Sequence, residues 1–224
     1  MNVAGIPAER IVLLGQSLGT AVVSGVAERY AVQGVEFAGI ILVSGFSDLT
    51  TMLSEYRIAG IFPVLAPFRA WPALLKLFHY FIVDKWQSDN RLASIVRHTK
   101  KRLRLSLIHS RNDPDIPWTE DNKLFRAAVM EKVDITDDEA FEAWKDERTI
   151  KKGERAFVTT WNAEPNIHVR QELFPYGGKQ THLWFKHVSG EADETNLGHN
   201  KVMGYAPVSL AIMRSFDLHG TTYA

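Results

Sequence analysis

A serine flanked by two glycines lies near the beginning of this 224-residue sequence. The unbroken apolar run at residues 11–14 leads directly into Gly15-Gln16-Ser17-Leu18-Gly19, which we call the serine elbow. A Gly-x-Ser-x-Gly sequence between a strand and a helix is typical of a strained turn that exposes the serine hydroxyl above a sheet. The pattern predicts that Ser17 is a nucleophile, and that Gly15 and Gly19 are small so that strand and helix can pass closely.

A serine hydroxyl is a weak nucleophile at neutral pH, so Ser17 needs a histidine base and usually a carboxylate that orients the histidine. On a strand-turn-helix elbow these partners follow in the order serine, acid, histidine. We predict Asp113 as the acid, because it follows the apolar run at residues 103–108 and so lies at the sheet edge where ligands bind. Asp115, two residues further on, is the alternative.

Eight histidines compete for the role of the base. His199 is favoured because it lies in a turn between an acidic loop and an expected closing helix, from which its ring can reach the sheet edge. His182 and His187, a short distance upstream, are the alternatives.

These residues require a sheet that brings distant turns together. Short, nearly continuous apolar runs are typical of strands buried on both faces of a parallel sheet. We expect such strands at residues 11–14, 37–45 and 103–108, a loosely alternating last strand at residues 167–174, and helices at residues 21–31, 120–132 and 202–216. Strands that alternate with helices predict a single α/β domain spanning residues 1–224, with a mostly parallel sheet flanked by helices.

Two stretches do not fit the alternation of strands and helices. Residues 46–99 contain an aromatic, proline-punctuated region and are interpreted as a cap over the sheet, with Phe62, Phe68 and Trp71 as substrate-binding candidates. Such a cap can contact a membrane surface, but its prolines and charges exclude a spanning helix. Residues 133–166 are rich in charge and are interpreted as a surface insertion.

The composition excludes several classes of function. Lys plus Arg and Asp plus Glu both number 26, so no overall positive field would attract nucleic acid. The absence of cysteine excludes a disulfide framework, a thiolate metal site and a cysteine nucleophile. No metal or cofactor is predicted. The sequence starts without a secretory signal pattern, and the cellular location stays open.

Three turns resemble the signature turns of the α/β-hydrolase family: the serine elbow, Asp113-Pro114-Asp115-Ile116-Pro117 and Gly198-His199-Asn200. The most similar branch contains the monoacylglycerol lipase and lysophospholipase-like members. The resemblance implies a serine hydrolase that cleaves carboxylic esters, especially lipid esters, through an acyl-enzyme. It assigns Ser17 as the nucleophile, His199 as the base, Asp113 as the orienting acid and the Leu18 amide as an oxyanion donor, without a cofactor.

The resemblance covers only the second half of the family domain. The family takes its second oxyanion donor from a loop after an early strand, and that strand would precede residue 1. We therefore expect Met1 to be an internal methionine of a longer enzyme, with any membrane anchor upstream. The alternative is a non-catalytic remnant, or a mis-assigned fragment, of such a hydrolase.

Overall fold

The computed structural model describes most of the chain outside the predicted cap and the segment before His199. The described residues are 5–49, 52, 85–113, 115–135, 137–152, 156–164, 166–174, 199, 202–204 and 206–218, with the backbone of 57–58 and 62–63. Phe68, Trp71, His182 and His187 lie outside these residues, as does the side chain of Phe62.

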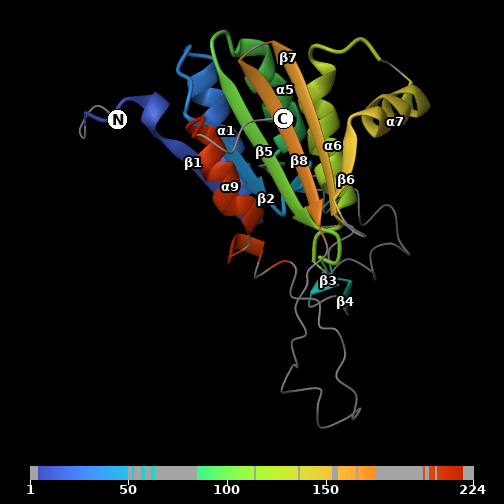
Figure 1. Cartoon of the computed structure of the whole chain (residues 1–224). Coiled ribbons are helices and arrows are strands. Elements are labelled where there is room, and N and C mark those ends of the chain that lie inside the picture. The colour runs from blue at the N-terminus through green and yellow to red at the C-terminus, as the bar shows by residue number, and fades with distance from the viewer. Residues whose placement is uncertain are drawn as a thin grey trace.

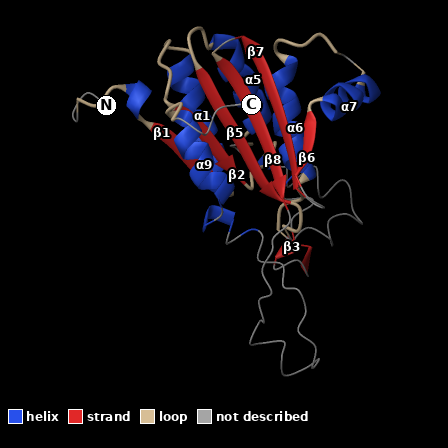
Figure 2. Cartoon of the chain, viewed as in Figure 1, coloured by secondary structure: helices blue, strands red, loops and turns tan. Residues whose placement is uncertain are grey.

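The described residues form a six-stranded mixed sheet, in the order β1-β2-β5-β8-β7-β6. Its strands are β1 (Val12–Gln16), β2 (Gly39–Val43), β5 (Leu103–Ser110), β8 (Ile167–Phe174), β7 (Ala156–Glu164) and β6 (Thr149–Lys152). The first four in this order run parallel, and β7 and β6 are antiparallel to their neighbours (Figure 2). A second, two-stranded sheet pairs β3 (Arg57–Ile58) with β4 (Phe62–Pro63). The expectation of an α/β fold with a mostly parallel sheet is confirmed.

Helices cover both faces of the sheet (Figure 1). One face carries α1 (Leu18–Ala31), α5 (Ser88–His98) and α6 (Thr119–Met130), and the other carries α9 (Ala206–Ser215). At one side of the sheet, α7 (Asp138–Glu147) leads into β6. The short helices η1 (Ala8–Arg10) and η2 (Val202–Gly204) precede β1 and α9. Among the described helices, none is long and apolar enough to cross a membrane.

Strand β2 shows why unbroken apolar runs form the centre of this sheet. Ile40 and Leu42 pack into the core beneath α1, α5 and α6, whereas Ile41 and Val43 pack into the separate core beneath α9. All four side chains are buried. Because successive side chains of a strand point to opposite faces, only a continuous apolar run fills both cores.

The end of the predicted cap belongs to the main domain. Helix α5 packs against α1 and α6, and Leu92, Ile95 and Val96 are buried in the core beneath them. Because these three buried apolar residues share one face, α5 packs on the sheet with its neighbouring helices, although the rest of its surface is polar. The part of residues 46–99 before α5 lies largely outside the described residues.

The charged stretch at residues 133–166 differs from the expected surface insertion, because it supplies α7 and two strands of the sheet. Val158 and Trp161 of β7 are buried, and Phe141 of α7 lies in the main core. Charged residues are frequent in this stretch, but several of its apolar residues, such as Phe141, Val158 and Trp161, face the core, whereas Ile150 is exposed. Spacing, rather than average polarity, determines which elements join the core.

A buried ionic cluster ties α9 to the sheet. Glu172 Oε1 accepts hydrogen bonds from Arg214 Nη1 at 2.6 Å and from Arg170 Nε at 2.7 Å. We expect Glu172→Gln to lower the free energy of unfolding by about 3 kcal/mol, because it leaves two buried guanidinium groups without a counter-charge. Urea denaturation measures the change.

The exposed pair of Arg148 with Glu147 provides the control, since the Glu147 side chain is 76% exposed. The variant Glu147→Gln should change the free energy of unfolding by less than about 1 kcal/mol. Equal losses in the two variants would contradict a stabilising role of the Glu172 cluster.

Candidate active site

The serine elbow has the strained geometry that its sequence predicts. Ser17 connects β1 directly to α1 and has φ 53° and ψ −124°, a region that non-glycine residues rarely adopt. Its N–H donates to Val43 O at 2.9 Å, and its carbonyl accepts from Thr20 N at 2.9 Å and from Thr20 Oγ1 at 2.6 Å. These bonds hold Ser17 at the carboxyl edge of β1 and β2.

The two glycines of the elbow differ in importance. A Cβ atom on Gly15 would lie 2.4 Å from the carbonyl oxygen of Gly19, which is too close for any side chain. A Cβ atom on Gly19 would meet no described atom within 4 Å. The expectation that both glycines are needed for close passage therefore applies to Gly15 alone.

Leu18 begins α1, immediately after Ser17. The first N–H groups of a helix have no partner within the helix, and the helix dipole makes this end electropositive. The Leu18 amide is therefore suited to stabilise negative charge on an atom beside Ser17. The Leu18 side chain is 49% exposed, so apolar surface lies next to the elbow.

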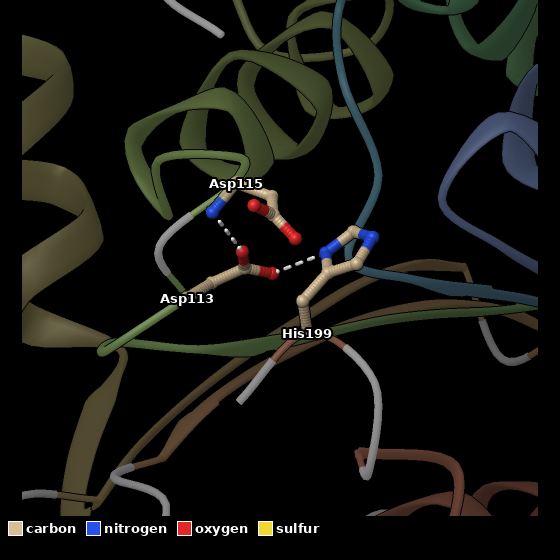
Figure 3. Close-up of side chains that lie close together, drawn as sticks. All are labelled: Asp113, Asp115 and His199. Atoms are coloured by element: carbon tan, nitrogen blue, oxygen red, sulfur yellow. Dashed lines mark hydrogen bonds and ion pairs between the residues drawn. The ribbon is translucent and has the colours of Figure 1, made fainter. Parts of the chain in front are cut away.

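Asp113 and His199, 86 residues apart, meet at the same edge of the sheet (Figure 3). His199 Nδ1 lies 2.8 Å from Asp113 Oδ2, and the side chains are 11% and 0% exposed. The other oxygen, Asp113 Oδ1, accepts from the backbone N–H groups of Asp115 and Ile116, each at 2.9 Å. The hydrogen bond to His199 thus belongs to Asp113, and Asp115 lies beside the pair.

Gln16 connects the histidine to the serine elbow. Its side-chain amide donates a hydrogen bond to the carbonyl oxygen of His199, across 183 positions of sequence. Among the described residues, no hydrogen bond joins the Ser17 hydroxyl to His199. Contacts of this kind commonly tighten only when substrate binds. The structure therefore brings the three predicted residues to one edge, with the acid–histidine contact formed.

The surroundings of Asp113 keep it ionised. Burial opposes the charge, but hydrogen bonds from His109 and His199 hold the pKa of the Asp113 carboxyl far below its usual range. A carboxylate at this position fixes the proton of His199 on Nδ1. Nε2 of His199, which points away from Asp113 in Figure 3, is then the free base.

Asp113, Asp115 and His199 also form a set of polar atoms within 4.8 Å of one another. Such a set resembles a metal site, but Asp113 uses its oxygens to accept hydrogen bonds from two backbone amides and from His199. A metal ion would compete for the same lone pairs. The donor set therefore fits an oriented histidine better than a bound cation.

Sequence reasoning missed the supporting roles of Gln16 and His109. His109 is fully buried behind Asp113 at the end of β5, and its Nε2 lies 3.0 Å from Ile116 O. The available signal was a histidine in an otherwise buried strand, where a polar ring requires partners. No sequence signal identifies the partner of Gln16.

Comparison of the sequence with protein-family models and with curated proteins found no match.

Proposed function

We propose that this chain is a serine hydrolase of carboxylic esters with the second half of an α/β-hydrolase fold. The observation that carries the proposal is the buried 2.8 Å contact between Asp113 and His199, at the sheet edge where Gln16 ties His199 to the serine elbow. The strained φ of Ser17 supports it, because such strain persists where a side chain must be presented.

The proposed reaction uses these side chains alone. Ser17 Oγ attacks the ester carbonyl while His199 Nε2 accepts the hydroxyl proton, which His199 then donates to the leaving alcohol. Asp113 stabilises the imidazolium, and the Leu18 amide donates to the oxyanion. Water, activated by His199, attacks the acyl-enzyme and releases the acid.

Lipid esters, such as monoacylglycerols or lysophospholipids, are the proposed substrates. The exposed apolar side chains of Leu18 and Val22, on the first turns of α1, support an apolar acyl chain beside Ser17. The aromatic stretch that contains Phe62, Phe68 and Trp71 is proposed as the cap over that chain. Any contact with a membrane surface would be made by the same stretch.

A non-catalytic remnant is the second candidate. The lack of a described hydrogen bond between the Ser17 hydroxyl and His199 favours it, as does the single oxyanion donor identified. Removing one oxyanion donor lowers kcat by about 10²–10³-fold. A remnant of this kind would retain the fold of the elbow without its reactivity.

Labelling with a fluorophosphonate probe tests the proposed function. We expect covalent modification that maps by mass spectrometry to Ser17, because the probe reacts only with an activated serine. Ser94→Ala, which removes a hydroxyl on α5 that contacts His98, should label normally. No labelling of the folded protein would favour the remnant, and modification at another serine would refute the assignment of Ser17.

A further inference from the structure

A second histidine lies behind the proposed catalytic acid. His109 is fully buried, and its Nε2 lies 3.5 Å from Asp113 Oδ2 as well as 3.0 Å from Ile116 O. Its Nδ1 lies 3.8 Å from Asp121 Oδ1, on the first turn of α6. The imidazole therefore stands between two buried carboxylates.

The polar contacts continue from Asp121 to helix α7. Gln171 of β8 donates from Nε2 to Asp121 Oδ2 at 2.8 Å and to Asn122 Oδ1 at 3.0 Å. Lys145 of α7 donates from Nζ to the same Asn122 oxygen at 2.6 Å, and Lys145 is 6% exposed. We call His109, Asp121, Gln171, Asn122 and Lys145 the buried relay.

The ionisable side chains of the buried relay, taken together with Asp113, are alternately acidic and basic. His109 lies between the carboxyl groups of Asp113 and Asp121, and Lys145 contacts Asn122, the residue that follows Asp121. Buried charges are costly unless they are paired, so alternation lets four ionisable groups share one interior. His109 Nδ1 and Asp121 Oδ1 are buried 3.8 Å apart, and neither atom has a hydrogen-bond partner among the described residues, so a proton on Nδ1 would face a carboxylate oxygen.

The protonation of His109 follows from these neighbours. Burial lowers its pKa, but the hydrogen bonds and charges of Asp113 and Asp121 outweigh burial and raise the pKa of His109 to about 10. Among the described residues, these carboxylates are the charged groups that face the ring. His199 contacts Asp113, and Lys145 contacts Asn122 at the other end of the relay. His109 is thus an imidazolium at neutral pH.

We propose that His109 is a positioning residue that holds Asp113 in place as an imidazolium. Lys145 of α7 completes the balance of buried charges that keeps His109 between its two carboxylates. The inference deepens the proposed function, because Asp113 matters to catalysis only if the chain is a serine hydrolase. It also gives a role to residues 133–166, since α7 supplies the last cation of the relay.

The first test measures stability against pH and does not depend on catalysis. A raised pKa means that the contribution of His109 is complete below the unfolded pKa of about 6.5 and is lost as pH rises through about 10. We expect His109→Gln to be less stable than the wild type at pH 6.5, with a difference that shrinks towards pH 10. His98→Gln on α5 is the matched control and should show no such trend.

A ring titration keeps the proposal testable if His109→Gln fails to fold. In nuclear magnetic resonance spectra of the wild type, the His109 ring should stay protonated between about pH 6 and pH 8, because its pKa is about 10. A His109 ring that titrates near its ordinary pKa would overturn the proposal, as would a stability difference that does not change with pH.

The second test concerns catalysis. His109→Gln should slow fluorophosphonate labelling of Ser17 by about 10²-fold, because small displacements of a positioned group are costly. The rate loss should shrink as pH rises through about 10, because the wild-type His109 ring then loses its proton as well. A rate loss that stays constant as pH rises to about 10 would indicate a merely structural role and would refute the proposal.

Lys145→Met tests the far end of the relay, with Lys152→Met on exposed β6 as the matched control. We expect Lys145→Met to slow labelling and Lys152→Met to leave it unchanged. If the wild type does not label, the proposed function fails, whereas the pH dependence of stability still decides the state of His109. Unchanged labelling in both His109→Gln and Lys145→Met would contradict the relay.

Discussion

Asp113→Asn should slow the acylation of Ser17 about 10⁴-fold, because an asparagine cannot hold His199 in the required tautomer. The carboxylate accepts the Nδ1–H of His199 at 2.8 Å and leaves Nε2 as the base. An amide of the same size presents an N–H group at this position or forces the proton onto Nε2, which then cannot accept the proton of Ser17. The rate of probe labelling, followed by mass spectrometry, measures the loss.

Asp115→Asn is the matched control, because Asp115 lies in the same turn, whereas the hydrogen bond with His199 Nδ1 is made by Asp113. It should retain labelling within about tenfold of the wild type, since it leaves the tautomer of His199 unchanged. Circular dichroism spectra establish that both variants are folded. Equal losses in the two variants would mean that the acids share the role, and an active Asp113→Asn would refute the predicted acid.

Strand β2 of the parallel half could be predicted because it is buried on both faces. Residues 40–43 have to be apolar at every position, and this requirement leaves an uninterrupted signal in the sequence. Strand β7 gives a weaker signal, because it pairs antiparallel with β8 near the side of the sheet and buries only part of its length. Helix α5 follows the aromatic, proline-punctuated region without a clear boundary in the sequence, so the prediction for residues 46–99 includes it in the cap.

The primary site residues could be predicted for a different reason. Ser17, Asp113 and His199 each lie in a turn with its own local pattern, and the order of the three turns restricted their roles. The residues behind them have no such pattern. His109 and Lys145 acquire partners only when β5, α6 and α7 pack together, and single-sequence patterns do not specify that packing.

The serine elbow also gives the largest expected effect on folding, through Gly15→Ala. The added Cβ would lie 2.4 Å from Gly19 O and 2.6 Å from Gly19 C, and both are backbone atoms that cannot rotate away. Gly15 also pairs with Leu42 in the sheet, so β1 cannot shift without breaking its register. We expect a loss of about 3 kcal/mol or more in the free energy of unfolding, measured by urea denaturation.

Gly19→Ala makes the same chemical change four residues later and has the opposite expected sign. Its Cβ would meet no described atom within 4 Å, and Gly19 lies in the first turn of α1, where alanine favours helix by up to about 1 kcal/mol. If Gly15→Ala has the same free energy of unfolding as the wild type, the close approach of β1 and α1 is contradicted. If Gly19→Ala unfolds the chain, a Cβ on Gly19 must clash with atoms other than its described neighbours, and the open space beside Gly19 is contradicted. Opposite signs for the two alanines would instead locate the steric constraint at Gly15, where β1 passes close to the first turn of α1.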